Sequence, residues 1–246
     1  MGDTPVSICV LLAAYNGSEW IEEQVKSILA QKNAIVTIFI SVDLCADSTY
    51  KLVKSLELTC ENINVLPYGI RYGGAAPNFF RLIKDVEFSC FDFVAFSDQD
   101  DIWFEWKLEK AILTLQDSDY IAYSSDVTAF WPNGEKQYLK KSYKQCEFDH
   151  YFEAPGPGCT FVFTRKALAE FKSDMVNLES CIQCITVNHD WFLYAYFRSK
   201  GHRWHIDDVS SMMYRQHYNN EVGINSGFKG YLLRLKMVRS HWYRLQ

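Results

Sequence analysis

The sequence predicts an α/β domain with a mostly parallel central sheet and helices on its faces, and three observations support this fold class. Residues 6–14, 35–40 and 91–96 are short apolar runs that each end abruptly in polar residues. Such runs are typical of strands that are buried on both faces of a parallel sheet. Segments with the apolar spacing of helices lie between them. With 246 residues, 48% of them apolar and 22% charged, the chain is long enough to build one such domain.

The first predicted strand, residues 6–14, is followed by a helix predicted over residues 18–29. Asn16 or Ser18 is the expected N-cap, since short polar side chains can accept hydrogen bonds from the first turn. Acidic residues in that turn suit the helix dipole. The apolar face of this helix consists of Ile21, Val25, Ile28 and Leu29.

The same alternation continues along the chain. After the strand at 35–40, a second helix is expected to begin at Asp47 or Ser48, and a third follows Asn78. After the strand at 91–96, a helix is expected over residues 106–115. Strands that alternate with helices indicate βαβ units and an open parallel sheet.

The second half of the chain is less regular. Strands are predicted at residues 120–124 and 159–164, with a Gly/Pro-rich loop at 154–158 before the second. Residues 191–197 have a helical pattern. No linker, repeat or low-complexity tract divides the chain, so we expect a single domain over residues 1–246.

Charge and cysteine usage narrow the function classes. The formal net charge of -5 offers no global basic field for nucleic acid. Eight cysteines are scattered through the chain, and we interpret the Cys181–Cys184 pair as buried or helical thiols rather than a zinc site. The N-terminus lacks the basic and apolar regions of a signal peptide, which predicts a reducing cytoplasm. The locally basic segment 230–246 is interpreted as a packed terminal helix, with an amphipathic helix on an anionic membrane as the alternative.

Acidic residues follow two of the predicted strands. Asp43 comes after the second strand, and Asp98, Asp100 and Asp101 come after the third. Ligands bind beyond the carboxyl ends of strands in open α/β sheets, where these carboxylates should gather. Their mutual repulsion favours a hard cation such as Mg²⁺, which in turn suits a nucleotide diphosphate. The alternative is a solvated acidic turn that caps the next helix.

Five ordered motifs resemble a known family. They are Leu12-Ala13-Ala14-Tyr15-Asn16-Gly17, Ser97-Asp98-Gln99-Asp100-Asp101-Ile102-Trp103, Gly158-Cys159-Thr160, His189-Asp190-Trp191, and Tyr214-Arg215-Gln216-His217 with Asn219-Asn220. In this order and spacing they resemble family 2 of the nucleotide-sugar glycosyltransferases, which have the GT-A fold (a Rossmann-like sheet), and especially its rhamnosyltransferase-like members. The resemblance covers most of the chain, to about Gly223.

The resemblance implies roles for individual residues. Asp190 matches the catalytic base. Asp100 and His217 match metal ligands for Mg²⁺ or Mn²⁺, and Gly156 and Gly158 lie in a flexible loop beside the acceptor. The donor-binding set is Ala14, Tyr15, Asn16, Glu19, Asp43, Gly74, Asn78, Asp98, Gln99 and Asp100. The acceptor side comprises Gly158, Cys159, His189 and Trp191.

One motif departs from the family pattern. The family has two adjacent Asp residues at the second strand end, whereas Val42-Asp43-Leu44-Cys45 keeps only the second. The residues that contact the nucleobase and the identity of the donor are therefore left open by the resemblance.

The implied reaction is an inverting single displacement from a dTDP- or UDP-sugar, with rhamnose one candidate, onto a hydroxyl of a bacterial surface glycan such as O-antigen or capsule. Residues 1–117 would form the donor half and residues 118–229 the acceptor half. Similar enzymes act on lipid-linked acceptors at the cytoplasmic face of the inner membrane, which adds interest to segment 230–246. The alternatives are a sugar nucleotidyltransferase and a non-catalytic nucleotide- or sugar-binding protein. For Asp190 alone, a helix N-cap is the competing interpretation, and for His217 alone a structural hydrogen bond.

Overall fold

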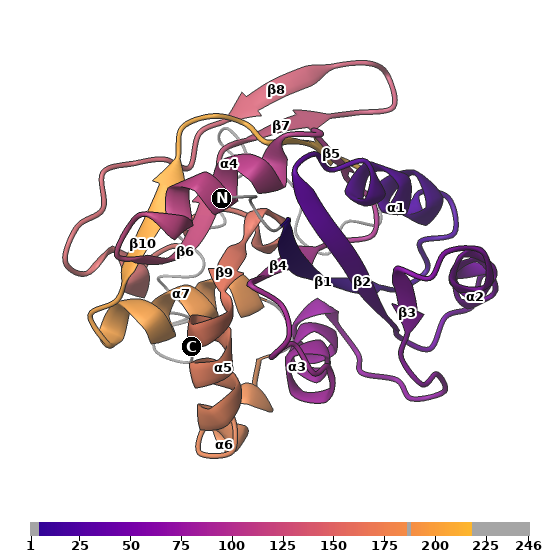
Figure 1. The fold of residues 1–246 in the computed structure, drawn as a ribbon, viewed down its shortest axis with the longest axis horizontal. Helices are drawn as coiled ribbons and strands as arrows, with labels where there is room; N and C mark the ends of the chain where they lie inside the picture. Colours follow the sequence, from indigo (N-terminus) through magenta and orange to yellow (C-terminus); the bar gives the residue numbers. More distant parts are fainter. Residues whose placement is uncertain (1–4, 186–187, 218–246) are drawn as a thin grey trace, which may run out of the picture.

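A computed structural model describes residues 5–185 and 188–217, and its central feature in these ranges is a seven-stranded sheet (Figure 1). The strand order is β10-β6-β9-β4-β1-β2-β3. β9 runs antiparallel to both of its neighbours, and the other pairs are parallel. The strands are β1 (Val6–Ala14), β2 (Ala34–Val42), β3 (Ile63–Val65), β4 (Phe93–Ser97), β6 (Tyr120–Ser125), β9 (Val162–Thr164) and β10 (Arg203–Asp207). The predicted mostly parallel α/β fold is confirmed.

The central strand β1 shows why the sheet forms. It pairs in continuous register with β2, from Val6 opposite Ala34 to Ala14 opposite Val42. Successive side chains point to opposite faces of a strand, and every residue of β1 from Ile8 onward is buried. Its side chains therefore enter two separate cores, one on each face of the sheet.

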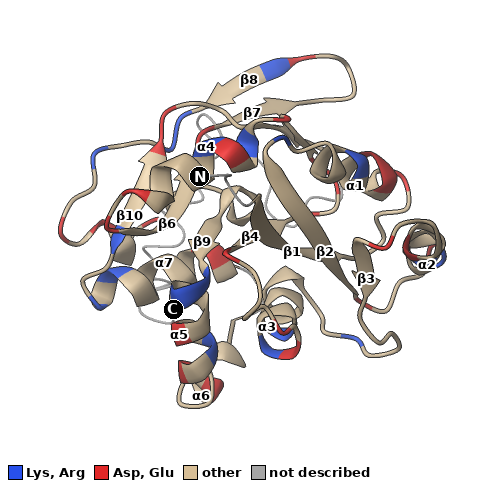
Figure 2. Cartoon of the chain, in the orientation of Figure 1, with Lys and Arg blue, Asp and Glu red and all other residues tan. Residues whose placement is uncertain are grey.

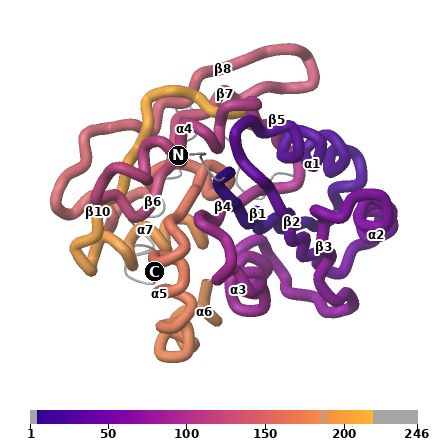
Figure 3. Tube along the Cα trace, in the orientation of Figure 1, coloured from indigo at the N-terminus to yellow at the C-terminus, as the bar shows by residue number. Residues whose placement is uncertain are grey.

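Helices cover both faces, as Figure 1 and Figure 3 show. The core on one face is completed by α1 (Ile21–Leu29), α2 (Thr49–Thr59) and α4 (Lys107–Gln116). The core on the other face is completed by α3 (Ala75–Asp85), α5 (Arg165–Asp174) and α7 (His189–Ser199). The short helix α6 (Glu179–Ile182) follows α5. In the described ranges, no helix is long and apolar enough to cross a membrane.

A smaller sheet lies beside the main one and was not predicted. Its order in the described part of the chain is β5-β11-β7-β8. The strands are β5 (Ile102–Trp103), β7 (Val127–Phe130), β8 (Lys136–Leu139) and β11 (Met212–Arg215). Because β5 directly follows the acid cluster and pairs with β11, this sheet brings the chain near residue 217 back to the end of β4.

Several local predictions need correction. The N-cap of α1 is Trp20, not Asn16 or Ser18, because the Asn16 side chain accepts a hydrogen bond from the Ala46 N–H (2.9 Å) instead. The first part of the predicted strand 159–164 is a short 3₁₀ helix, η2 (Gly158–Thr160). Asp190 is not an N-cap, since α7 begins at His189 and its N-cap is Asn188.

The cysteine pair was predicted to be buried or helical, and only the helical part holds, for Cys181. Cys181 lies in α6 and Cys184 just after it, and both are exposed. All eight cysteines fall within the described ranges and are unpaired there. The predicted helix over residues 230–246 lies outside the described residues.

Candidate active site

The end of β1 is fastened to the acid cluster by a side-chain amide. The Tyr15 N–H donates to Gln99 Oε1 (2.8 Å), and Gln99 Nε2 donates to the Tyr15 carbonyl (2.8 Å). Gly17 lies against the same amide, so closely that a Cβ there would overlap Gln99 Oε1. The sequence segments 14–17 and 97–101, both predicted to bind the donor, therefore form one rim at the carboxyl ends of β1 and β4.

Three carboxylates gather at the end of β4, as predicted. Asp100 and Asp101 are buried, and Asp98 is half-buried. Asp101 Oδ1 accepts from the Arg215 N–H (3.1 Å), while Oδ2 has no hydrogen-bond partner among the described residues. Burial, together with the charges of Asp100 and Asp98, raises the pKa of Asp101 well above its usual range. The turn thus brings three mutually repelling carboxyl groups together at one strand end.

His217 completes this cluster. Its Nε2 atom lies 2.8 Å from Asp100 Oδ2, and its ring stacks on Trp20 with centroids 3.9 Å apart. Arg215 holds the end of β11, and with it His217, next to the acid cluster, because its Nε donates to the Asp100 carbonyl (2.7 Å). The two predicted metal ligands are therefore side by side. The carboxylate oxygens suit Mg²⁺ or Mn²⁺, and the imidazole nitrogen beside them favours Mn²⁺ of the two, so the residues present fit a divalent cation.

A second group of side chains that could ligate a metal lies at the end of β4. Ligand atoms of Asp98, Asp101 and Cys159 are all within 4.8 Å of one another. Burial, then the nearby Asp101, raise the pKa of Cys159 well above its usual range, which keeps the thiol protonated. A protonated thiol is a poor ligand for a hard cation, so the carboxylates are the better candidates.

Lys107 lies in the interior next to this group. It is completely buried, and its Nζ lies 4.0 Å from the Trp103 ring centroid and donates to the Thr160 carbonyl (3.5 Å). Burial lowers the pKa of Lys107 to about 8, against the attraction of the nearby Asp101. A buried ammonium group at this place offsets part of the carboxylate charge above it.

Asp190 approaches the rim from the other side. It lies in the first turn of α7, where its Oδ1 accepts from the Trp191 N–H (2.8 Å). A Cβ on Gly158 would stand 3.3 Å from Asp190 Cβ. Since the next residue, Cys159, contacts the acid cluster, η2 connects Asp190 directly to it. Burial raises the pKa of Asp190 from 3.8 to about 6, although backbone N–H groups and Lys141 oppose the shift.

His189 and Cys159, both expected on the acceptor side, are buried. The His189 ring stacks on Phe79 with centroids 4.2 Å apart, and a Cβ on Gly158 would stand 2.6 Å from its Nε2. Burial lowers the pKa of His189 to about 3, so the ring is neutral. Their assignment to the acceptor side stays a prediction, and the His189 ring packs against Phe79 and Gly158. Trp191 is half-buried, and its Nε1 donates to the His150 carbonyl (2.8 Å).

Asp43 is buried and organises a loop. Its carboxylate accepts from three backbone N–H groups, those of Leu44 (2.7 Å), Tyr72 (2.7 Å) and Gly73 (2.8 Å). These bonds hold residues 72–73, just before α3, against the end of β2. A side chain of the predicted donor-binding set therefore also positions the loop before α3.

The other predicted donor residues fall into two groups. Asn78 is buried, and its Nδ2 donates to the Ser41 carbonyl (3.0 Å) and the Ala14 carbonyl (3.5 Å), which joins α3 to the ends of β1 and β2. Gly74 is the N-cap of α3. Tyr15 and Glu19 are exposed at the rim. The predicted donor-binding set thus contains both exposed and buried residues. The buried residues support the loops on which the exposed residues lie.

Comparison with known proteins identifies the chain. The family model described as glycosyltransferase like family 2 matches residues 5–217. This chain belongs to that glycosyltransferase family. It is also similar to the dTDP-rhamnosyl transferase RfbG of Shigella flexneri, at 46% identity over 95% of this chain and 81% of that protein.

Solved structures agree with the fold of this glycosyltransferase. It resembles a fragment of S. aureus TarS, residues 1–349, at a TM-score of 0.62 and 15% identity over 85% of this chain and 60% of that one. The same fragment in complex with UDP-GlcNAc gives a TM-score of 0.64 at 16% identity, over 95% of this chain and 66% of that one. The chain thus spans less than two thirds of either TarS chain.

Three features of this glycosyltransferase were missed in the sequence. The Gln99–Gly17 contact, the buried Lys107 and the loop-organising role of Asp43 all depend on which segments the fold brings together. For Lys107 a signal existed, because it occupies an apolar position of the helix that includes Leu108, Ala111 and Ile112.

Proposed function

We propose that this glycosyltransferase transfers rhamnose from dTDP-rhamnose, with inversion, onto a hydroxyl of a growing bacterial surface glycan. The similarity to a dTDP-rhamnosyl transferase over 95% of the chain supports this choice of donor. We further propose that it works at the cytoplasmic face of the membrane on a lipid-linked acceptor. Segment 230–246, outside the described residues, is one candidate for peripheral contact there.

The observation that carries the proposal is the short connection between Asp190 and the acid cluster. Gly158 lies against Asp190, and its neighbour Cys159 lies within the Asp98–Asp101 group. A donor whose diphosphate sits at the acid cluster would therefore have its sugar close to Asp190. Catalysis of glycosyl transfer needs this juxtaposition of a base and a leaving-group site.

Asp190 supplies the general base in this mechanism. Its carboxylate takes the proton from the acceptor hydroxyl while the hydroxyl oxygen forms the new bond to the anomeric carbon. The bond between that carbon and the diphosphate oxygen breaks, and dTDP leaves with the electron pair. A pKa near 6 keeps Asp190 ionised at neutral pH yet more basic than an ordinary aspartate.

Asp100 and His217, with Asp98 beside them, are the residues that would hold a divalent cation. Such an ion would neutralise the charge that develops on the departing diphosphate. The chain's own part is to keep these ligands in place, through the Arg215–Asp100 and Trp20–His217 contacts. Gln99 keeps the Tyr15 backbone at the same rim, where it would flank the nucleotide.

The proposal is tested by incubating the protein with dTDP-rhamnose and a lipid-linked acceptor and measuring both dTDP release and the anomeric configuration of the product. We expect acceptor-dependent dTDP release, an inverted linkage and loss of both in Asp190→Asn. UDP-GlcNAc serves as the comparison donor. Turnover of UDP-GlcNAc with none of dTDP-rhamnose would refute the donor assignment, and a retained configuration would refute the mechanism.

A further inference from the structure

Exposed aromatic side chains are concentrated between β8 and the loop that leads to Gly158. Among the described residues, six aromatic side chains are exposed, and five of them fall within residues 138–152. Exposed apolar patches of this kind mark interaction sites. The five are Tyr138, Tyr143, Phe148, Tyr151 and Phe152, with exposures of 51–67%.

Lysines accompany these rings. Lys140, Lys141 and Lys144 are all exposed, and Lys140 Nζ lies 5.7 Å from the Tyr143 ring centroid. The exposed carboxylates of the same stretch are Glu147 and Glu153, so cations are in excess here although the whole chain has a net charge of -5. Figure 2 shows lysines along the loop after β8. The aromatic–lysine face is defined here as Lys140, Tyr143, Lys144, Phe148, Tyr151 and Phe152.

The face is fastened to the fold at both ends. The buried Asp126 accepts from the Tyr138 hydroxyl (2.7 Å) and from the Ser142 N–H (2.8 Å). Farther along, Asp149 accepts from the Tyr194 hydroxyl (3.0 Å) and pairs with Arg198 (3.4 Å), both on α7. The Asp149 carboxylate therefore points toward α7 and is paired there. The exposed rings are held outward by this scaffold.

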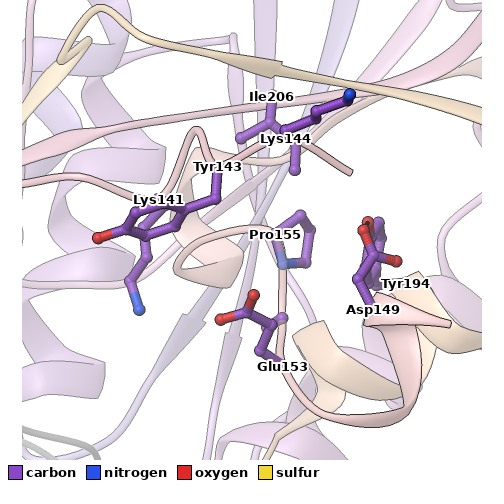
Figure 4. Close-up of a pocket in the computed structure, with 9 residues that line it drawn as sticks. Lys141, Tyr143, Lys144, Asp149, Glu153, Pro155, Tyr194 and Ile206 are labelled. Carbon is purple, nitrogen blue, oxygen red and sulfur yellow. Dashed lines mark hydrogen bonds between the residues drawn. The ribbon is translucent and has the colours of Figure 1, made fainter. Parts of the chain in front are cut away.

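The same scaffold places the face beside Asp190. Trp191, the next residue on α7, donates to the carbonyl of His150, which adjoins Tyr151. A small pocket lies between the face and the loop to Gly158, and its lining includes Lys141, Tyr143 and Lys144 together with the carboxylates Asp149 and Glu153 (Figure 4). A molecule bound along the face would thus lie next to the proposed base.

We propose that the aromatic–lysine face docks on an anionic phospholipid surface. Aromatic rings favour the interfacial region of a bilayer, and lysines beside them attract anionic headgroups. Phe148 and Phe152 have no polar group, and no excess of carboxylates is present to bind sugar hydroxyls, so a lipid surface fits better than a soluble glycan. Docking in this orientation would present a lipid-linked acceptor to Asp190; only this consequence rests on the proposed function.

The test measures binding of the full-length protein to vesicles of phosphatidylcholine alone and of an equal mixture with phosphatidylglycerol. We expect binding to the anionic vesicles that falls about tenfold in Lys140→Glu/Lys144→Glu and in Phe148→Ser/Phe152→Ser. The matched control is Lys51→Glu/Leu58→Ser on α2, which changes an exposed lysine and an 85% exposed leucine elsewhere and should bind normally.

A positional probe separates this face from segment 230–246. Cys146 is exposed within the stretch, and Cys90 is exposed before β4, at the opposite end of that strand from the acid cluster. An environment-sensitive fluorophore is attached to each in variants whose other exposed cysteines are serine. We expect a blue shift on anionic vesicles at Cys146 and none at Cys90.

The proposal would be overturned by no vesicle binding, by binding that the face variants leave unchanged, or by no shift at Cys146 while the protein is bound. Loss of soluble oligosaccharide binding in the face variants would also overturn it and assign the face to a glycan. Donor binding is measured in parallel. If the wild type binds no nucleotide sugar but the Cys146 probe shifts, the proposed function fails and the docking face stands.

Discussion

Nε2 of His217 lies 2.8 Å from Oδ2 of Asp100, although 117 residues separate them in the chain. The small sheet makes this contact, since β11 ends at Arg215 and pairs with β5, which begins directly after the acid cluster. The stack of His217 on Trp20 then fixes the imidazole. Two segments that are distant in sequence are thereby combined into one candidate metal and diphosphate site.

Removing either partner should weaken the binding of a divalent cation at this site. We expect Asp100→Asn and His217→Gln each to lower Mn²⁺ affinity by at least about tenfold in the presence of nucleotide. Electron paramagnetic resonance of free Mn²⁺ measures this directly. Glu61→Gln, an exposed acid just after α2 and outside the predicted site, is the control and should bind normally. Equal affinity in all four proteins would place the metal elsewhere.

Asp190→Asn should lower kcat by about a thousandfold, because the acceptor proton loses its base. In the wild type, kcat/KM should rise with pH and level off above about 6, since the carboxylate must be ionised and burial raises its pKa to about 6. A pH–rate profile measures both. A profile that is flat between pH 5 and 7 would argue against Asp190 as the base.

The same variant should be more stable than the wild type at neutral pH. The folded-state pKa of Asp190 is raised from 3.8 to about 6, so its ionisation destabilises the fold. This cost is absent below about pH 4 and complete above about pH 6, where it amounts to about 3 kcal/mol. Urea unfolding of both proteins at pH 4 and pH 7.5 checks the difference, which should appear only at the higher pH. Equal stability at both would contradict the burial argument.

Gly17→Ala should disturb the rim by displacing Gln99, because the added methyl overlaps Gln99 Oε1. We expect a loss of about 1–3 kcal/mol in the free energy of unfolding and a higher KM for the donor. In a Gln99→Ala background the same substitution should cost much less. A double-mutant cycle by urea unfolding measures the coupling, and additive effects would mean that the two residues do not interact.

Asp43→Ala should lower stability as well as donor affinity. It leaves the backbone N–H groups of Tyr72 and Gly73 without their acceptor, at a cost of about 2–4 kcal/mol. Asp43→Asn retains one acceptor oxygen and should lose less. If Asp43 acts only on the nucleobase, both variants will bind donor poorly yet unfold at the wild-type urea concentration.

The sequence predicted well where long elements have one strong pattern. β1, β2 and α3 have nine or more residues each, and apolar periodicity located them. The four strands of the small sheet have two to four residues, too few to establish a period, and they pair across the whole chain. The α1 N-cap was wrong because Asn16 bonds to a loop thirty residues away, which local rules do not anticipate.

The same distinction holds for the site. Asp98, Asp100 and Asp190 could be singled out because the motifs around them resemble a family. The burial of His189 and Cys159 could not, because it depends on the packing of α3 and η2 against α7. Charge balance beneath the rim likewise depends on Lys107, whose place is set by its contacts with the Thr160 carbonyl and the Trp103 ring.

The central claim is that the acid cluster binds a nucleotide diphosphate of the dTDP class through a divalent cation. Calorimetric titration of dTDP and UDP, each with and without Mn²⁺, into the wild type and Asp100→Ala tests it most directly. We expect dTDP to bind only with Mn²⁺, more tightly than UDP, and not to the variant. Binding of dTDP that is independent of both Mn²⁺ and Asp100, or no binding of either nucleotide, would contradict the account.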